Sequence, residues 1–153
     1  MKATRRKPLK VLFVEDNPGD ARLVKEALAE AGSGEFHLTH VQNLHDGLRR
    51  LARHKFDVIL LDLMLEETPR LGALFEIYEQ SVRVPVVVLT GLEDRSVRRW
   101  AREEGARDYL IKGALEPGRL ATALLEAVEH RPEPRGSSYV SRGRQRPPAI
   151  GSR

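Results

Sequence analysis

The chain has 153 residues, which is enough for one ordinary domain and too few for two domains with separate cores. Hydrophobic residues make up 41% and charged residues 31%, which is typical of a globular domain, and the longest apolar runs are too short to cross a bilayer. Cysteine is absent, which excludes disulfides, thiol nucleophiles and cysteine-bound zinc. We expect one domain without a fused effector domain, located in the cytoplasm.

The formal net charge of +4 is unevenly distributed along the chain. Residues 1–10 carry +5, residues 132–153 carry +4, and residues 11–131 carry −5. An acidic body argues against a folded face that binds nucleic acid. The last segment is also rich in proline, glycine and serine, which predicts disorder. The expected organisation is a basic N-terminal arm at 1–8, a folded domain at 9–130 and a disordered basic tail at 131–153.

Five short apolar segments have the length and composition of β-strands, and segments with helical spacing follow them. Pro18 suits the first turn of the first helix with Asn17 as its cap, and Gly32 and Gly105 stand where the first and fourth helices should end. The predicted strands are Leu9–Val14, Phe36–Val41, Val58–Leu61, Val84–Leu89 and Tyr109–Ile111. The predicted helical stripes are Val24, Ala27, Leu28 and Ala31; Leu44, Leu48 and Leu51; Leu71, Leu74, Phe75 and Tyr78; Val97, Trp100 and Ala101; and Leu120, Leu124, Ala127 and Val128.

Regular alternation of strands and helices predicts right-handed crossovers and a parallel sheet covered by helices on both faces. Val58–Leu61 and Val86–Leu89 are uninterrupted apolar runs, as expected of central strands. Phe36–Val41 alternates between apolar and polar residues, as expected nearer an edge. We therefore predict the α/β class, with a single doubly wound, five-stranded parallel sheet.

Side chains capable of chemistry follow the predicted strands. Glu15 and Asp16 follow the first strand and Asp62 follows the third. Thr90 and Lys112 follow the fourth and fifth. Because ligands of such sheets bind beyond the carboxyl ends of the strands, we expect these five side chains to meet at one edge.

Three converging carboxylates repel one another, so the cluster needs a cation. Only oxygen ligands are available, which favours a hard ion such as Mg²⁺. The charge of Lys112 and the hydroxyl of Thr90 suit two oxygens of a phosphoryl group. We interpret the cluster as a site that forms an aspartyl phosphate, with Asp62 as the nucleophile.

The same residues resemble the receiver domains of two-component response regulators over residues 9–130. The matching features are the acidic pair in Val14-Glu15-Asp16-Asn17, Asp62 closing Val58-Ile59-Leu60-Leu61, the pair Thr90-Gly91, and Tyr109 three residues before Lys112. The resemblance implies the flavodoxin-like (βα)5 fold with strand order 2-1-3-4-5. It also implies that Asp62 takes a phosphoryl group from a histidine kinase or a histidine phosphotransfer protein.

For the remaining site residues, the resemblance implies Mg²⁺ ligation by Glu15, Asp16, Asp62 and the backbone carbonyl of Met64. It further implies a switch in which Thr90 moves toward the phosphoryl group and the aromatic ring of Tyr109 swings inward. The face formed by the fourth helix, fifth strand and fifth helix would change as a result. The expected output is contact with a downstream protein, or homodimerisation through that face, rather than enzymatic turnover of a separate substrate.

Four arginines, Arg95, Arg98, Arg99 and Arg102, share one face of the predicted fourth helix. Two interpretations remain open: a surface for an acidic partner, or a solvated face balanced by nearby acids. Trp100 on the same helix is expected to be a packing residue. The five histidines show no metal-ligand spacing and are interpreted as structural or exposed.

Three positions depart from the family pattern. Glu66 and Arg70 replace a usual proline and glycine after Asp62, and Gly113 replaces a proline after Lys112. The altered loop motivates an alternative hypothesis, an adaptor or scaffold with the same fold that signals without phosphorylation. A flavodoxin-like or other phosphate-handling enzyme is disfavoured, because the acidic first turn would repel a flavin phosphate.

Overall fold

The computed structural model describes residues 7–32, 34–65, 72–81, 83–91, 93–116 and 118–130. Most of the predicted basic arm and all of the predicted tail at 131–153 lie outside these ranges. The strands are β1 (Leu9–Val14), β2 (Phe36–Val41), β3 (Val58–Leu61), β4 (Val86–Thr90) and β5 (Asp108–Ile111). The helices are α1 (Pro18–Ala31), α2 (Leu44–Arg53), α3 (Gly72–Gln80), α4 (Arg95–Glu104) and α5 (Arg119–Glu129), with a 3₁₀ turn, η1 (Lys112–Ala114).

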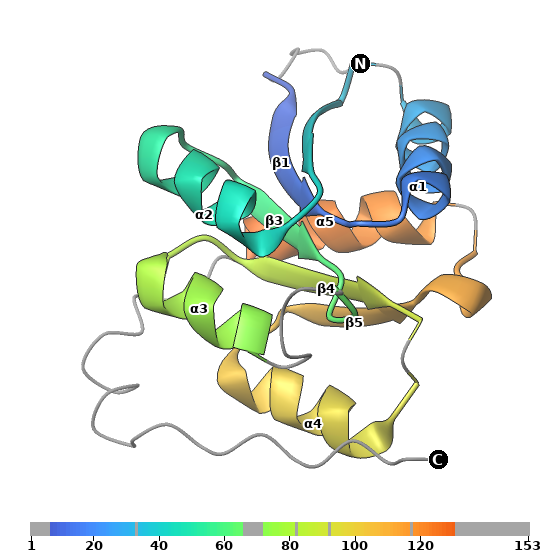
Figure 1. Cartoon of the computed structure of the whole chain (residues 1–153). Coiled ribbons are helices and arrows are strands. Elements are labelled where there is room, and N and C mark those ends of the chain that lie inside the picture. Colours follow the sequence, from blue (N-terminus) through green and yellow to red (C-terminus); the bar gives the residue numbers. More distant parts are fainter. Residues whose placement is uncertain are drawn as a thin grey trace.

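The strands form one parallel sheet in the order β2-β1-β3-β4-β5, which confirms the predicted fold class and strand order (Figure 1). β2 is an edge strand, as its alternating sequence predicted. The first three strands have the predicted bounds, whereas β4 runs from Val86 to Thr90 instead of from Val84 to Leu89. Pro85 has no N–H and pairs only through its carbonyl, which accepts from the Ile59 N–H at 2.9 Å, and Thr90 is in register with Ile111.

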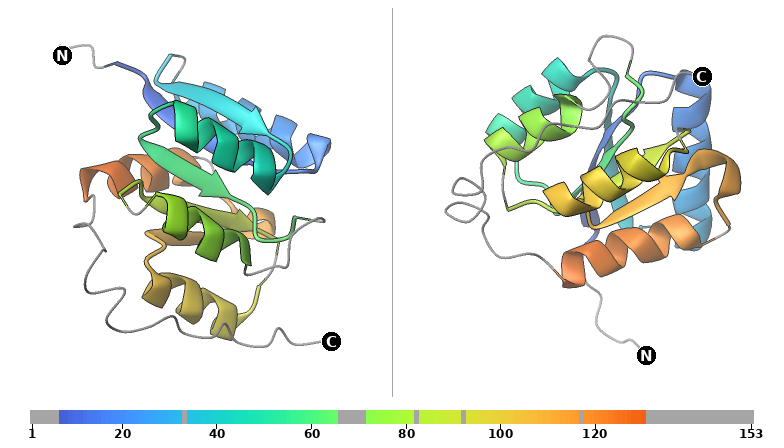
Figure 2. Two further views of the ribbon diagram at one scale, coloured as in Figure 1. Left: turned by 60° about the vertical axis from the view of Figure 1, so that its left-hand side comes forward. Right: turned by 90° about the horizontal axis from the view of Figure 1, so that it is seen from below.

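The core has two parts, one on each face of the sheet, because successive strand residues point to opposite faces. Leu12, Ile59 and Val88 belong to the part covered by α2, α3 and α4. Phe13 and Leu60 belong to the part covered by α1 and α5. Figure 2 shows these two helix layers with the sheet between them. Both faces of β1, β3 and β4 are therefore buried, which is why these strands carry uninterrupted apolar runs.

Local signals account for the helix ends. The Asn17 side chain caps α1 by accepting from the Asp20 N–H at 2.9 Å, as predicted. The Asn43 side chain caps α2 in the same way, by accepting from the Asp46 N–H at 2.8 Å. Gly105 ends α4 with φ of 119°, a left-handed conformation that glycine adopts at little cost. Within residues 7–130, gaps aside, the structure has no helix with the length and hydrophobicity needed to cross a bilayer.

Two neighbouring leucines of α5 provide a matched test of the packing. Leu124 is fully buried against the sheet, whereas Leu125 is 39% exposed. Leu124→Ala should lower the free energy of unfolding by about 2–5 kcal/mol, because it leaves a cavity in the core. Leu125→Ala should lower it by less than about 1 kcal/mol. Urea unfolding followed by circular dichroism measures both, and equal losses would contradict the placement of α5.

Candidate functional site

The candidate site lies at the carboxyl edge of the sheet, where strand pairing fixes the backbone of its residues. Val14 of β1 is in register with Leu61 of β3, so the residues that follow them start from the same level. The Glu15 N–H donates to the Val41 carbonyl at 3.0 Å, and the Asp62 N–H donates to the Val14 carbonyl at 3.2 Å. Both acids therefore extend the backbone hydrogen bonding of the sheet beyond the strand ends.

The three predicted acids converge. Glu15, Asp16 and Asp62 each place a carboxylate oxygen within 4.8 Å of the others. Glu15 and Asp62 are 0% and 2% exposed, and Asp16 is half-buried. Three carboxylates at this separation, with oxygen as the only ligand type, fit a hard divalent ion such as Mg²⁺. The donor set therefore agrees with the metal predicted from the sequence.

Lys112 begins η1 directly after β5 and reaches the acids from the far side of β4. Its Nζ lies 2.9 Å from Glu15 Oε1 and 3.0 Å from Asp62 Oδ2. A third carboxylate, Asp20 Oδ2 in the first turn of α1, lies nearer still, at 2.7 Å. Asp20 was not among the residues predicted for the site. Its sequence context, an acid three residues after a capping asparagine, indicates only a helix start.

Glu15 is held on several sides. Its Oε2 accepts from the Asn17 N–H at 3.2 Å, in addition to the ion pair with Lys112. Its carbonyl oxygen lies 2.8 Å from His40 Nε2, and because a carbonyl only accepts, that ring nitrogen is the donor. His40 also packs against the Phe13 ring, with centroids 5.3 Å apart. His40 thus has the structural role predicted for the histidines.

Burial determines the protonation of the site. It raises the pKa of Glu15 to about 7; hydrogen bonding to Lys112 opposes the rise, and the charge of Asp62 adds to it. Burial alone would lower the pKa of Lys112, but its contacts with Asp20, Glu15 and Asp62 outweigh burial and place that pKa above its usual value. Lys112 is therefore cationic, while the site still holds more acids than bases.

Asp62 directly follows β3, and two further predicted residues, Met64 and Thr90, lie near the same end of the sheet. The Met64 N–H donates to Asp62 Oδ1 at 2.9 Å, which keeps the Met64 backbone beside the acidic cluster. Thr90 is fully buried at the end of β4, the strand next to β3. Glu66 and Arg70, which motivated the adaptor hypothesis, lie outside the described residues.

Tyr109 of β5 is buried, at 3% exposure, and points into the core beneath α4. The Arg98 guanidinium lies over its ring, 5.2 Å from the centroid. Burial raises the pKa of Tyr109 to about 12, although the charge of Arg98 opposes this. The predicted switch tyrosine is thus in an inward position in this structure.

The arginines of α4 are all exposed, but three of them have partners in the structure. Arg98 covers Tyr109, Arg99 lies 3.9 Å from Glu103, and Arg102 lies 3.3 Å from Asp108. These contacts favour the solvated, internally balanced interpretation for part of the stripe. Trp100 is buried and packs edge-on against Phe75, with ring centroids 5.4 Å apart, so it is a packing residue as predicted.

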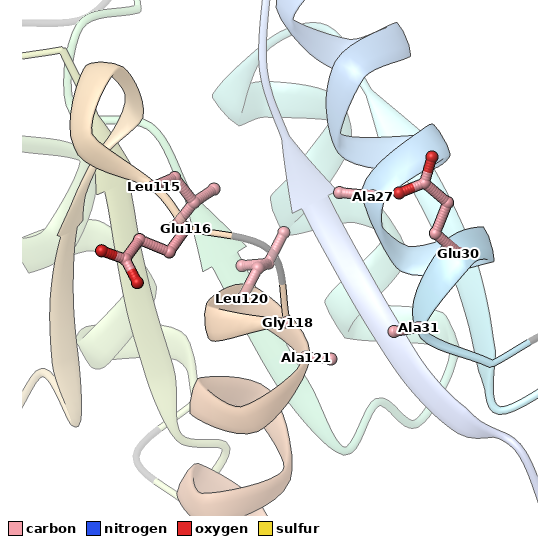
Figure 3. Close-up of a pocket in the computed structure, with 8 residues that line it drawn as sticks. All are labelled: Ala27, Glu30, Ala31, Leu115, Glu116, Gly118, Leu120 and Ala121. Atoms are coloured by element: carbon pink, nitrogen blue, oxygen red, sulfur yellow. The ribbon is translucent and has the colours of Figure 1, made fainter.

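A separate cavity of about 490 Å³ lies between α1 and the start of α5. Figure 3 shows Glu30 and Glu116 on opposite sides of it, with leucine and alanine side chains between them. The residues of the sheet edge do not line this cavity: Glu15, Asp16, Asp20, Asp62, Thr90 and Lys112 are all absent from its lining. The two glutamates of its lining do not converge, in contrast to the acids at the sheet edge.

Solved structures share this architecture, and curated proteins are similar in sequence. The receiver domain of a sensor histidine kinase from Pseudomonas aeruginosa PAO1 superposes with a TM-score of 0.68 at 27% identity, covering 80% of this chain and 98% of that one. In that structure a magnesium ion is coordinated in the active-site cleft. Protein PilH of Pseudomonas aeruginosa is 25% identical over 115 residues, covering 74% of this chain and 93% of PilH.

The transcriptional regulatory protein TrcR of Mycobacterium tuberculosis is 33% identical over 108 residues, which cover 69% of this chain. The match covers only 40% of TrcR, so this chain spans less than half of the length of that regulator. The family model for the response regulator receiver domain matches residues 11–125, most of the chain. The chain therefore belongs to the response regulator receiver domain family.

Proposed function

We propose that this receiver domain accepts a phosphoryl group on Asp62 and signals through protein–protein contact. The observation that carries the proposal is the convergence of Glu15, Asp16 and Asp62 with Lys112 at one sheet edge. The donor is a phosphohistidine of a histidine kinase or of a histidine phosphotransfer protein. The chain acts as a signalling protein whose only covalent chemistry is its own phosphorylation and dephosphorylation.

In the proposed transfer, a carboxylate oxygen of Asp62 attacks the phosphorus of the donor. The new P–O bond forms as the P–N bond of phosphohistidine breaks, and the histidine leaves with the bonding electron pair. Lys112 Nζ, 3.0 Å from Asp62 Oδ2, donates to a phosphoryl oxygen and offsets its charge. The Met64 N–H orients Asp62 through Oδ1, and this leaves Oδ2 on the side of Lys112.

Glu15, Asp16 and Asp62 would hold the Mg²⁺ ion, with the backbone carbonyl of Met64 as a further ligand. When bound, Mg²⁺ neutralises charge on the transferring group and on the carboxylates. The site supports this assignment because its acids outnumber its single lysine and because burial already makes the Glu15 charge unfavourable.

Signal output in this proposal passes through Thr90 and Tyr109 to the face formed by α4, β5 and α5. Thr90 ends β4 beside the site, and Tyr109 lies three residues before Lys112 on the neighbouring strand. The contact of Arg98 with the Tyr109 ring links that strand to the exposed arginines of α4. A downstream protein or a second copy of the chain would bind this face, with Arg95, Arg98, Arg99 and Arg102 in contact.

Phosphorylation can be tested with acetyl phosphate and Mg²⁺. The wild type should gain one phosphoryl group, seen as an 80 Da increase in intact mass, that is stable in acid and labile in base. Asp62→Asn should gain none, because it removes the nucleophile. Asp57→Asn is the matched control, since Asp57 precedes the same strand at its opposite end and contacts the Lys10 N–H. Labelling of Asp62→Asn would refute the proposal. A wild type that is not labelled and does not bind beryllofluoride would favour the alternative hypothesis, an adaptor that signals without phosphorylation.

Mg²⁺ binding should depend on pH through Glu15. Its pKa is raised in the folded state from an ordinary 4.5 to about 7, so between these values the folded protein retains a proton that the ion must displace. Mg²⁺ affinity should therefore be roughly thirtyfold weaker at pH 5.5 than at pH 8, measured by calorimetry. Glu15→Gln should bind weakly at both pH values. Equal wild-type affinities at the two pH values would contradict the raised pKa.

The raised pKa of Glu15 also predicts how the free energy of unfolding of the metal-free protein depends on pH. A carboxyl group with a raised folded pKa binds its proton more tightly in the folded than in the unfolded state. The contribution of Glu15 to the free energy of unfolding therefore falls as pH rises from 4.5 to about 7, and is level above that. Urea unfolding of wild type and Glu15→Gln in chelator should show a smaller pH dependence for the variant. Identical pH profiles would contradict this.

A further inference from the structure

Asp20 lies closer to the ammonium group of Lys112 than Glu15 or Asp62 does. Its Oδ2 lies 2.7 Å from Lys112 Nζ, compared with 2.9 Å for Glu15 and 3.0 Å for Asp62. Glu15 and Asp62 also belong to the acidic cluster, whereas Asp20 does not. Among the three carboxylates on Lys112, Asp20 is thus the one outside both the phosphoacceptor and the proposed ion site.

Comparison with α2 shows that the orientation of Asp20 is not a consequence of helix capping. α1 and α2 start with the same motif, Asn17 followed by Asp20 and Asn43 followed by Asp46, and both asparagines accept the N–H of the aspartate. In α2 the aspartate side chain turns back to its own cap, with Asp46 Oδ2 accepting from Asn43 Nδ2 at 3.3 Å. In α1 the equivalent carboxylate is directed at Lys112 instead.

The donor capacity of Lys112 makes this contact relevant to phosphorylation. An ammonium group has three N–H donors, and three carboxylates already surround it. A phosphoryl oxygen can therefore be bound only if at least one of these contacts is given up. Formation of the acyl phosphate removes the negative charge of the Asp62 carboxylate and weakens the contact of that carboxylate with Lys112. Glu15 is needed in the acidic cluster, so Asp20 is the acceptor that can stay in place.

We propose that Asp20 is a positioning residue that keeps Lys112 Nζ beside the phosphoacceptor while the contacts of Lys112 with Glu15 and Asp62 are exchanged for a phosphoryl oxygen. The expected effect of Asp20 on the phosphorylation rate rests on the proposed function, whereas the restraint of Lys112 by Asp20 does not. Asp20 suits this task because its backbone is anchored in the first turn of α1, where its N–H donates to the Asn17 side chain. Its side chain is 37% exposed, so retaining its charge costs little desolvation.

The sign of the effect separates positioning from mere proximity. If Asp20 acted only through its negative charge, its removal would reduce repulsion of the incoming phosphoryl group, and phosphorylation would become faster. If Asp20 positions Lys112, its removal leaves the ammonium free to move, and phosphorylation becomes slower. The two roles therefore predict changes in opposite directions.

Phosphorylation kinetics with acetyl phosphate and saturating Mg²⁺ test the proposal on the full chain. Asp20→Ala should slow phosphorylation by on the order of tenfold, the scale of one lost charge-assisted hydrogen bond. Asp20→Asn keeps an acceptor oxygen without the charge and should fall between Asp20→Ala and wild type. Asp46→Ala removes the equivalent acid of α2 and should behave as wild type. A rate for Asp20→Ala equal to or above that of wild type overturns the proposal.

A second measurement does not depend on phosphorylation. The ¹⁵N resonance of the Lys112 ammonium, assigned by its loss in Lys112→Met, should show slow proton exchange in the wild type and in Asp46→Ala. Exchange should be clearly faster in Asp20→Ala, with or without Mg²⁺. Unchanged exchange in Asp20→Ala overturns the proposal even if the kinetics change. A wild type that takes no phosphate refutes the proposed function, and the exchange rate then decides alone whether Asp20 holds Lys112.

Discussion

Burying carboxylates at the end of a hydrophobic sheet is unfavourable unless a positive charge accompanies them. Glu15 and Asp62 are almost completely buried, and the Lys112 ammonium lies within 3.0 Å of both. This ion network joins the ends of β1, β3 and β5, which belong to distant parts of the sequence. Among the described residues, Lys112 is the cation that both acids contact, and its removal would leave them with backbone N–H donors but no neutralising charge.

The negative charges of this network outnumber its one positive charge, and this excess suits a divalent cation. Three acids, Glu15, Asp20 and Asp62, contact one lysine, and Asp16 lies beside two of them. Burial and the charge of Asp62 raise the pKa of Glu15 despite its contact with Lys112. The remaining negative charge favours a divalent ion over further protonation near neutral pH. Stability alone would be better served by fewer acids, so their number fits a binding role.

β5 connects this edge to the helix layer on one face of the sheet. Lys112 directly follows the strand, and Tyr109 lies within it, buried beneath α4 with Arg98 across its ring. The site lysine and the buried tyrosine are therefore carried by one strand and the turn that follows it. The exposed arginines of α4 extend from this point to the surface, partly balanced by Glu103 and Asp108.

The sequence by itself determined the five strands to within two residues at each end, the edge position of β2, and the meeting of Glu15, Asp16, Asp62 and Lys112 at one edge. Apolar periodicity is a local property, and parallel strands present their carboxyl ends at one edge, so spacing sufficed to bring these residues together. Asp20 could not be found in this way, because locally it matches Asp46, and both look like ordinary acids in a first helical turn. Only the packing of α1 beside the end of β5 decides that one of them meets Lys112.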